Sequence, residues 1–443
     1  MRQILAARWV VPIDGPVIDD GEVVIEDGII QTVRPRTAPA SDVRDIGNAV
    51  ILPGLINAHT HLEYTAQRGF LEDVPFFPWI RALTAAKARL DREDWLASAR
   101  LGALESLAAG MTTIGDNTDA GVTAQIASET GMRGVIYQEF FGIDPREDAI
   151  VILENLSNKL AALKQYESDR VQIAISPHAP YTVRPELFTA LHNHPELQHY
   201  RTSIHLAESP AEAALIKSGM GPFGEMLERR GIPWAAYGGT PTEYLNALGA
   251  VRKGALLVHC VHQTEDDISL VEKSGASIVH CPKSNGKLGA GIAPLGRWLE
   301  REGLNIALGT DSAVSNNTLD LFEEMRFALL TARAVSTSVE AVLARDVLRM
   351  ATIGGARALG VDTAAGSLTP GKRADITVVN LQRAHTVPAT DPESAIVYSA
   401  RAEDVALTMC DGVILYDNGV WPGMDPVSVT AEAEAVRRKC AST

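Results

Sequence analysis

The segment PGLINAHTH, residues 53–61, decides the fold. Its apolar residues continue a run that predicts a strand over 51–57, and two histidines follow at the end of that run. Because alternate side chains of a strand point to the same side, His59 and His61 should face the same way. A strand that ends in this pair can present two ligands to one metal ion.

Seven further β-branched runs follow this strand, and helical stretches such as 94–109, which ends at Gly110, alternate with them. The eight predicted strands are 51–57, 112–115, 134–137, 171–175, 202–204, 255–258, 277–279 and 305–308. Eight strand–helix units predict an α/β fold, a closed parallel (β/α)8 barrel of the TIM type.

Both ends of the chain are rich in short strands. The predicted strands are 6–11, 17–25 and 29–33 before the barrel, and 374–379 and 413–416 after it. Asp27-Gly28 is a hairpin signal. We therefore expect one small composite β-sandwich built from both ends. The expected domains are 1–52 and 361–425 for this sandwich, 53–360 for the barrel, and 426–443 for a terminal helix or tail.

Composition narrows the class of partner. The 443 residues are 46% hydrophobic and 21% charged, with a formal net charge of −15. A nucleic acid or an anionic membrane would require a basic face, so a small-molecule substrate is the expected partner. Four cysteines without paired metal spacing fit a reducing cytoplasm. Apolar runs are too short to predict a membrane span.

The reactive side chains share one position relative to the predicted strands: each lies at or just past the end of a strand. They are His59, His61, His178, His205, Glu208, His259, His280 and Asp311. In a parallel barrel these strand ends form one rim, where catalytic groups collect. The sequence therefore predicts an active site at that rim.

Three imidazoles and one carboxylate predict a metal centre. His59, His61 and His205 with Asp311 form a nitrogen-rich set that suits zinc or another borderline divalent metal, with room for one water. Such a metal lowers the pKa of its water toward about 7. Asp311 can accept the proton of that water. Glu208, three residues after His205, is close enough to act as a proton shuttle.

Six motifs in this order resemble the amidohydrolase superfamily over nearly the whole chain. They are PGLINAHTH (53–61), SPHAPY (176–181), HLAE (205–208), VHC (258–260), CPKSN (281–285) and LGTD (308–311). The resemblance is to its mononuclear-metal aminohydrolases, the branch with chlorohydrolase and S-adenosylhomocysteine/methylthioadenosine deaminase relatives.

The resemblance implies roles for individual residues. Glu208 would protonate a ring nitrogen beside the attacked carbon, and His259 would orient or polarise the water. His178 would contact the substrate, and Ser284 and Asn285 are further candidates for substrate contact. The fourth strand lacks a lysine at its end, where binuclear relatives carry one. This departure implies one metal, zinc first, with iron or manganese as alternatives. A homodimer is a further expectation from the family.

The segment 63–79 is unusually aromatic for this chain. It either caps the pocket, with Trp79 stacking on a flat substrate, or plugs the barrel under the first helix. Three more histidines, His192, His194 and His199, lie in a polar stretch where we expect solvent exposure. His262 and His280 are expected to support the rim.

The expected activity is hydrolytic deamination of an amino-substituted nitrogen heterocycle, with an adenine-type nucleoside or thionucleoside as the first substrate class. Alternatives within the same chemistry are a guanine- or cytosine-type base, aminodeoxyfutalosine, and an s-triazine that loses chloride or an amine. Hydrolysis of a cyclic amide is a further alternative. A non-catalytic binding scaffold would be expected to lack some of the reactive side chains, which are all present.

Overall fold

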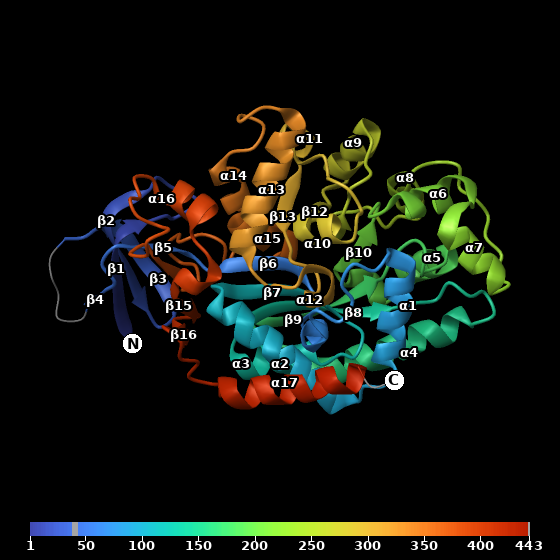
Figure 1. The fold of residues 1–443 in the computed structure, drawn as a ribbon, viewed down its shortest axis with the longest axis horizontal. Coiled ribbons are helices and arrows are strands. Elements are labelled where there is room, and N and C mark those ends of the chain that lie inside the picture. Colours follow the sequence, from blue (N-terminus) through green and yellow to red (C-terminus); the bar gives the residue numbers. More distant parts are fainter. Residues whose placement is uncertain (38–42, 442–443) are drawn as a thin grey trace.

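Eight parallel strands form a barrel at the centre of the molecule (Figure 1). The computed structural model describes residues 1–37 and 43–441, so residues 38–42 and 442–443 of the predicted terminal segments lie outside the described residues. The barrel strands are β6 (Leu55–Thr60), β7 (Met111–Thr118), β8 (Arg133–Phe140), β9 (Val171–Pro177), β10 (Thr202–Leu206), β11 (Ala255–His259), β12 (Ser277–His280) and β13 (Asn305–Leu308). Neighbours in the sheet follow the order of the sequence.

The barrel is closed between its first and last strands. A parallel bridge joins Thr60 to Asp311, just beyond the end of β13. The Asn57 side chain reinforces this seam, because its Nδ2 donates to Thr310 Oγ1 at 2.8 Å and its Oδ1 accepts from Thr310 N at 3.0 Å. The predicted (β/α)8 barrel is therefore confirmed.

One predicted strand was wrong. The run 51–57 contains the end of β5 (Ala49–Pro53), which belongs to the terminal sheet, and the start of the barrel strand β6. Gly54 separates them at a point where an added Cβ would lie 2.1 Å from Thr112 Oγ1. Both strands are buried and apolar, so hydropathy alone gives no sign of the break.

Helices cover the outside of the barrel and its rim (Figure 1). They are α1 (Phe76–Lys87), α2 (Arg92–Ala108), α3 (Thr123–Thr130), α4 (Ala149–Leu163), α5 (Pro185–Asn193), α6 (Pro210–Ser218), α7 (Gly221–Arg229), α8 (Pro241–Ala247), α9 (Glu265–Ser274), α10 (Pro282–Lys287), α11 (Leu295–Leu299), α12 (Ala313–Asn316), α13 (Leu321–Ser336), α14 (Ala344–Arg349), α15 (Gly355–Leu359), α16 (Pro392–Ser394) and α17 (Pro426–Ala441). Helix α2 begins two residues before the predicted start, because Asp91 and Asp94 form a capping box.

Strands from both ends of the chain form one mixed sheet beside the barrel (Figure 1). Its strands are β1 (Arg2–Val10), β2 (Ile18–Glu26), β3 (Ile29–Pro35), β4 (Val43–Asp45), β5, β14 (Ile376–Asn380), β15 (Val405–Cys410) and β16 (Val413–Asp417). The ends join where β5 pairs antiparallel with β14. Side chains from its N-terminal and C-terminal strands pack into a separate hydrophobic core, as expected for a small composite β unit.

Within residues 1–37 and 43–441, no helix combines the length and apolar character needed to cross a bilayer.

Candidate metal and active site

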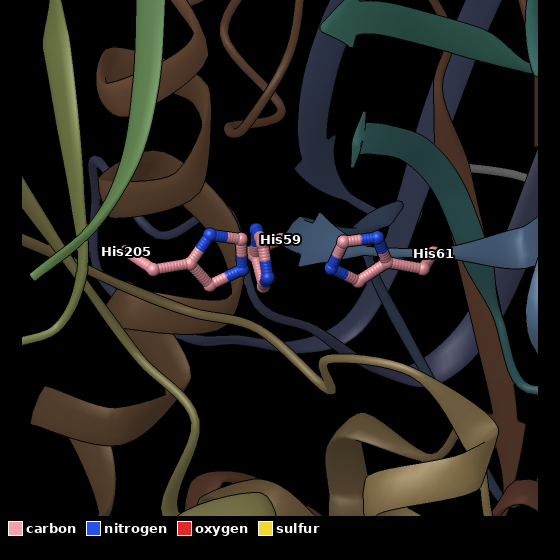
Figure 2. Close-up of side chains that lie close together, drawn as sticks. All are labelled: His59, His61 and His205. Carbon is pink, nitrogen blue, oxygen red and sulfur yellow. The ribbon is translucent and has the colours of Figure 1, made fainter. Parts of the chain in front are cut away.

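Three histidines converge at the carboxyl ends of β6 and β10. Figure 2 shows His61 and His205 pointing toward each other from opposite sides, with His59 between them. The His61 and His205 rings lie 5.7 Å apart and nearly parallel, and the His59 ring stands edge-on to both at 4.9 Å. Each offers one nitrogen, and the three nitrogens lie within 4.8 Å of one another. Asp311 Oδ1 lies 3.7 Å from His59 Nε2 and 3.5 Å from His61 Nε2.

The histidine nitrogens are arranged as metal donors. His205 Nδ1 lies 2.9 Å from the carbonyl oxygen of His178 and donates to it, which leaves the Nε2 lone pair facing His59 and His61. Both His59 nitrogens and Nδ1 of His61 are buried without a hydrogen-bond partner in the described residues. Burial lowers the pKa of all three imidazoles, so they are neutral at neutral pH. Neutral imidazoles are the form that binds a metal.

Asp311 is held as an ionised carboxylate. Ser284 Oγ and Ser315 Oγ donate to its Oδ2 at 2.6 and 2.8 Å, and the backbone N–H of Ser312 donates to Oδ1 at 2.7 Å. Burial alone would raise the pKa of Asp311, but the interaction with the facing His59 side chain outweighs burial and holds that pKa well below its usual range. The carboxylate can therefore coordinate a cation and accept a proton only from a strongly acidified donor.

Glu208 and His259 face each other beside the histidine cluster. His259 Nε2 lies 3.8 Å from Glu208 Oε1, and Tyr181 Oη donates to Glu208 Oε2 at 3.3 Å. His259 Nδ1 lies 2.9 Å from Asn285 Oδ1 and donates to it, so Nε2 is the ring nitrogen that faces Glu208. Burial raises the pKa of Glu208 above its ordinary value, which favours the protonated form of this carboxyl group.

A second buried carboxyl group, Glu212, fixes the position of Glu208. Its Oε1 accepts from Ala207 N at 2.8 Å and its Oε2 accepts from Glu208 N at 2.9 Å. Glu212 was not among the residues predicted from the sequence. Its signal was present in Ser209-Pro210-Ala211-Glu212, because Ser209 caps α6 and a glutamate three residues later typically returns a hydrogen bond to the preceding backbone.

The backbone of the rim is strained at the candidate site. Ala207, His259, Cys260 and Asp311 all adopt left-handed φ angles, between 49° and 72°. Such a conformation costs about 1–3 kcal/mol for a non-glycine residue and persists only where the surroundings enforce it. The strain therefore lies at the turns that carry Glu208, His259 and Asp311.

A cavity of about 450 Å³ opens onto these groups. Its wall is strongly aromatic and includes Tyr64, Phe76, Trp79, Tyr181 and Phe223. The segment 63–79 contains most of a 3-10 helix over 62–67 and the start of α1. Because Trp79 lines the cavity, the structure favours the expectation that segment 63–79 caps the pocket over the alternative that it plugs the barrel under the first helix.

Three other candidates for substrate contact differ in their placement. His178 lines the cavity, and its Nδ1 lies 2.9 Å from Thr182 Oγ1. Ser284 and Asn285 lie behind the site in α10, hydrogen-bonded to Asp311 and His259. Their buried position favours a supporting role over the substrate contact that the sequence suggested.

The remaining histidines lie away from the cluster. His192 and His199 are exposed and His194 is half-buried, as the polar stretch suggested. His280 is buried against Trp298, with ring centres 5.6 Å apart. His262 Nε2 lies 2.8 Å from the carbonyl oxygen of Ala290. Both therefore brace the rim from outside the histidine cluster.

Three charged side chains in the cavity were missed by the sequence analysis. Lys87, Asp119 and Glu139 line the cavity together with His178. Each is a single charged residue outside any recognised motif, so the sequence offered no signal that would bring them together. Folding brings these three side chains together, because α1, the turn after β7 and the end of β8 meet at one side of the barrel mouth.

Comparisons with known proteins agree with this geometry. A closed parallel barrel with histidines and a carboxylate at its carboxyl rim can hold a catalytic metal ion. The model of the amidohydrolase family matches residues 50–415, and the chain belongs to that family.

The relatives are named as nucleoside deaminases. The chain is 34% identical to the 5-methylthioadenosine/S-adenosylhomocysteine deaminase of Moorella thermoacetica over 435 residues, 96% of each chain. It is 34% identical to the 5'-deoxyadenosine deaminase of Methanothermobacter thermautotrophicus, over 96% of this chain and 97% of the relative. A crystal structure of an adenosine deaminase from Xanthomonas campestris with bound zinc superposes with a TM-score of 0.88 at 29% identity, over 100% of this chain and 99% of that one.

Proposed function

We propose that the protein is a metal-dependent hydrolase that deaminates an amino-substituted nitrogen heterocycle, with an adenine-type nucleoside or thionucleoside as the first substrate class. One observation carries the proposal. His61, His205 and Asp311 line one aromatic cavity with the facing pair Glu208 and His259, and the buried His59 ring lies 4.9 Å from the rings of His61 and His205. The names of the three relatives described above, deaminases of 5-methylthioadenosine and S-adenosylhomocysteine, of 5'-deoxyadenosine and of adenosine, support this class.

The residues fit one divalent metal. Four donors converge, and a cation between them would give the buried, unpartnered Nε2 of His59 a partner. Three imidazoles and a carboxylate suit zinc, with iron or manganese as alternatives. The bound zinc of the Xanthomonas campestris structure supports zinc as the first choice.

The chain's own groups account for the proton transfers. A divalent metal in this set supplies Lewis-acid chemistry that makes a water molecule nucleophilic at neutral pH. Asp311 and His259 orient that water beside the substrate, and Asp311 accepts its proton. Glu208 donates its proton to the ring nitrogen next to the carbon that carries the amino group. The water oxygen bonds to that carbon. The bond from carbon to the amino nitrogen then breaks, and the amino group takes the proton held by Asp311 and leaves as ammonia. The remaining hydroxyl proton returns to Glu208 as the carbonyl group of the product forms.

The test is ammonia release by the purified protein loaded with zinc or manganese. The panel is adenosine, 5'-deoxyadenosine, methylthioadenosine, S-adenosylhomocysteine, aminodeoxyfutalosine, guanine, cytosine and melamine. We expect release from at least one adenine nucleoside, loss of release after chelation, and recovery when the metal is restored. Absence of ammonia from every member, with one metal bound per chain, would contradict deamination. Absence of bound metal would contradict the metal centre.

A further inference from the structure

A short segment before α1 is tied to the helices that stand behind Asp311. We call residues 68–75 the strap; it leads into α1, which places Trp79 in the cavity wall. At the start of the strap, Arg68 forms an ion pair with Glu105 of α2, and Glu105 Oε1 also accepts from Leu319 N at 3.0 Å. The strap is therefore fixed at one end to the segment that follows α12.

Glu72, in the middle of the strap, makes a second tie. Its Oε1 accepts from Lys287 Nζ at 3.2 Å and from Asn317 Nδ2 at 2.9 Å, and its Oε2 lies 3.1 Å from the same Nζ. The hydrogen bond from Asn317, followed by the contacts with Lys287, lowers the pKa of Glu72, so this carboxylate is ionised at neutral pH.

Lys287 is the cation that this tie shares with the rim. Its Nζ also donates to the carbonyl oxygen of Val314 at 3.0 Å and to Asn317 Oδ1. An ammonium group has three N–H donors, so Glu72, Val314 and Asn317 use all of them. A single exposed ion pair contributes little, but the Lys287 side chain is only 22% exposed and serves three groups.

One ammonium group thus joins the strap to two short helices. Lys287 is the last residue of α10, Val314 lies in α12, and Asn317 is the C-cap of α12. The two helices have six and four residues, too few to be stable on their own hydrogen bonds. Their positions therefore depend on side-chain contacts such as those of Lys287.

The same two helices hold the proposed catalytic groups. Ser284 of α10 and Ser315 of α12 donate to Asp311 Oδ2 at 2.6 and 2.8 Å. Asn285 of α10 accepts from His259 Nδ1 at 2.9 Å. A shift of either helix would therefore move the carboxylate of Asp311 or the ring of His259.

We propose that Lys287 is a positioning residue that couples the strap to Asp311 and His259. While Lys287 holds Glu72, α1 stays over the cavity, and α10 and α12 keep both catalytic groups aligned. Because all three N–H groups of Lys287 are engaged, it acts through these neighbours and not on the substrate. The inference rests on the proposed deaminase function for its kinetic test and adds a link between pocket closure and catalysis.

The two sides of the tie can be separated by substitution. Lys287→Met removes the ammonium group and frees the strap, α10 and α12 together. Glu72→Gln weakens the strap alone, because Lys287 keeps its bonds to Val314 and Asn317. Lys439→Met is the control: Lys439 pairs with Asp94 and joins α17 to α2, so it removes a lysine ion pair elsewhere.

The first measurement is steady-state ammonia release by the zinc-loaded proteins, with kcat expressed per bound zinc. Glu72→Gln should raise KM about threefold, with kcat within about twofold of wild type. Lys287→Met should raise KM and also lower kcat about tenfold or more, since a hydrogen bond to a charged group typically contributes that much. The double variant should be no worse than Lys287→Met, because both changes remove one contact. Lys439→Met should keep both constants.

The second measurement is hydrogen exchange, which needs no turnover. Residues 68–75 and 312–319 are followed in the same zinc-loaded proteins. Lys287→Met should speed exchange in both segments, whereas Glu72→Gln should speed it only in the strap. This comparison separates a link between the segments from a general loss of stability.

Three results would overturn the inference. One is a kcat of Lys287→Met within about twofold of wild type. Another is unchanged exchange over 312–319 in that variant. The third is an equal loss of kcat in Lys439→Met. If the wild-type protein releases no ammonia from any member of the panel, the deaminase function fails, and the exchange comparison alone decides whether Lys287 links the strap to α12.

Discussion

The backbone N–H of Asp311 donates to the carbonyl oxygen of His59 at 3.0 Å, while the side chains of the same two residues approach to 3.7 Å. The contact that closes the barrel therefore also sets the spacing of two proposed metal ligands. His59 lies on the first barrel strand and Asp311 directly beyond the last. Any change that opens this seam should weaken metal binding before it disturbs the rest of the barrel.

A substitution at Gly309 tests whether the barrel seam and metal binding are coupled. A Cβ added at this position would lie 2.8 Å from the carbonyl oxygen of His59 and 2.9 Å from its Cβ. Gly309→Ala should push the end of β13 away from β6, weaken zinc binding at least tenfold, and lower the free energy of unfolding by about 1–3 kcal/mol. Zinc titration and urea unfolding measure the two effects. Gly423→Ala is the control, because its Cβ would meet nothing within 4 Å.

Glu208→Gln should separate proton transfer from metal binding. The amide keeps the size of the side chain but cannot give a proton to the substrate, so turnover should fall about 10²–10⁴-fold. Zinc content should stay at one per chain, since Glu208 contacts His259 and Tyr181 and lies outside the proposed ligand set. The exposed His192 provides the control, and His192→Ala should keep wild-type turnover. Wild-type turnover in Glu208→Gln would contradict the shuttle.

Glu212→Gln should reduce turnover through Glu208. An amide offers one acceptor oxygen for the two N–H groups of Ala207 and Glu208, so one loses its partner and the turn shifts. We expect kcat to fall about tenfold or more, with smaller changes in KM and in zinc content. The exposed Glu228, on α7, gives the matched control Glu228→Gln. A parallel loss of zinc and of kcat would instead indicate a purely structural role.

Three buried carboxyl groups should make stability fall as pH rises. Burial raises the pKa of Glu139, Glu212 and Glu324 to about 8 each, against 4.5 for an exposed glutamate. Between pH 4.5 and 8 the folded protein keeps protons that the unfolded chain releases, so the free energy of unfolding decreases with rising pH. Glu324 lies outside the candidate site, hydrogen-bonded to Asn316 and to the backbone of Lys283.

Glu324→Gln removes one of these protons and should flatten the pH dependence by up to about 1.4 kcal/mol per pH unit. Urea unfolding of both metal-loaded proteins at pH 5, 6, 7 and 8 measures the difference. Since metal release at low pH affects both proteins alike, the comparison isolates Glu324. Parallel curves would show that Glu324 stays ionised in the fold.

The features that could be predicted from the sequence are those marked by a pattern of neighbouring residues. Strands ending in histidine, with the spacing of His59 and His61, gave the barrel and the rim, because parallel strands must present their carboxyl ends together. The break at Gly54 was missed, since two buried apolar strands separated by one residue look like a single run. Strand β15 was missed because no turn signal marks where it begins: its residues directly follow the charged Glu403 and Asp404.

Residues that act through tertiary contacts were the least predictable. Glu139 and Lys87 come from separate elements, and each reads as an ordinary charge in its own segment. Their shared cavity exists only once β8 and α1 are in place. Likewise Ser284 and Asn285 were expected at the substrate, because a rim position does not distinguish a side chain facing the cavity from one facing a neighbour's carboxylate or imidazole.

The composite terminal sheet and the seam at Thr60 and Asp311 have a consequence for biosynthesis. Strands β1 to β6 are synthesised first. However, β5 can pair with β14, and Thr60 of β6 with Asp311, only after those later segments have been made. The proposed ligands span residues 59 to 311, so the metal centre cannot assemble on a nascent chain shorter than that. Metal loading is thus a late event, and until then the edges of β5 and β6 remain open to pairing with other chains.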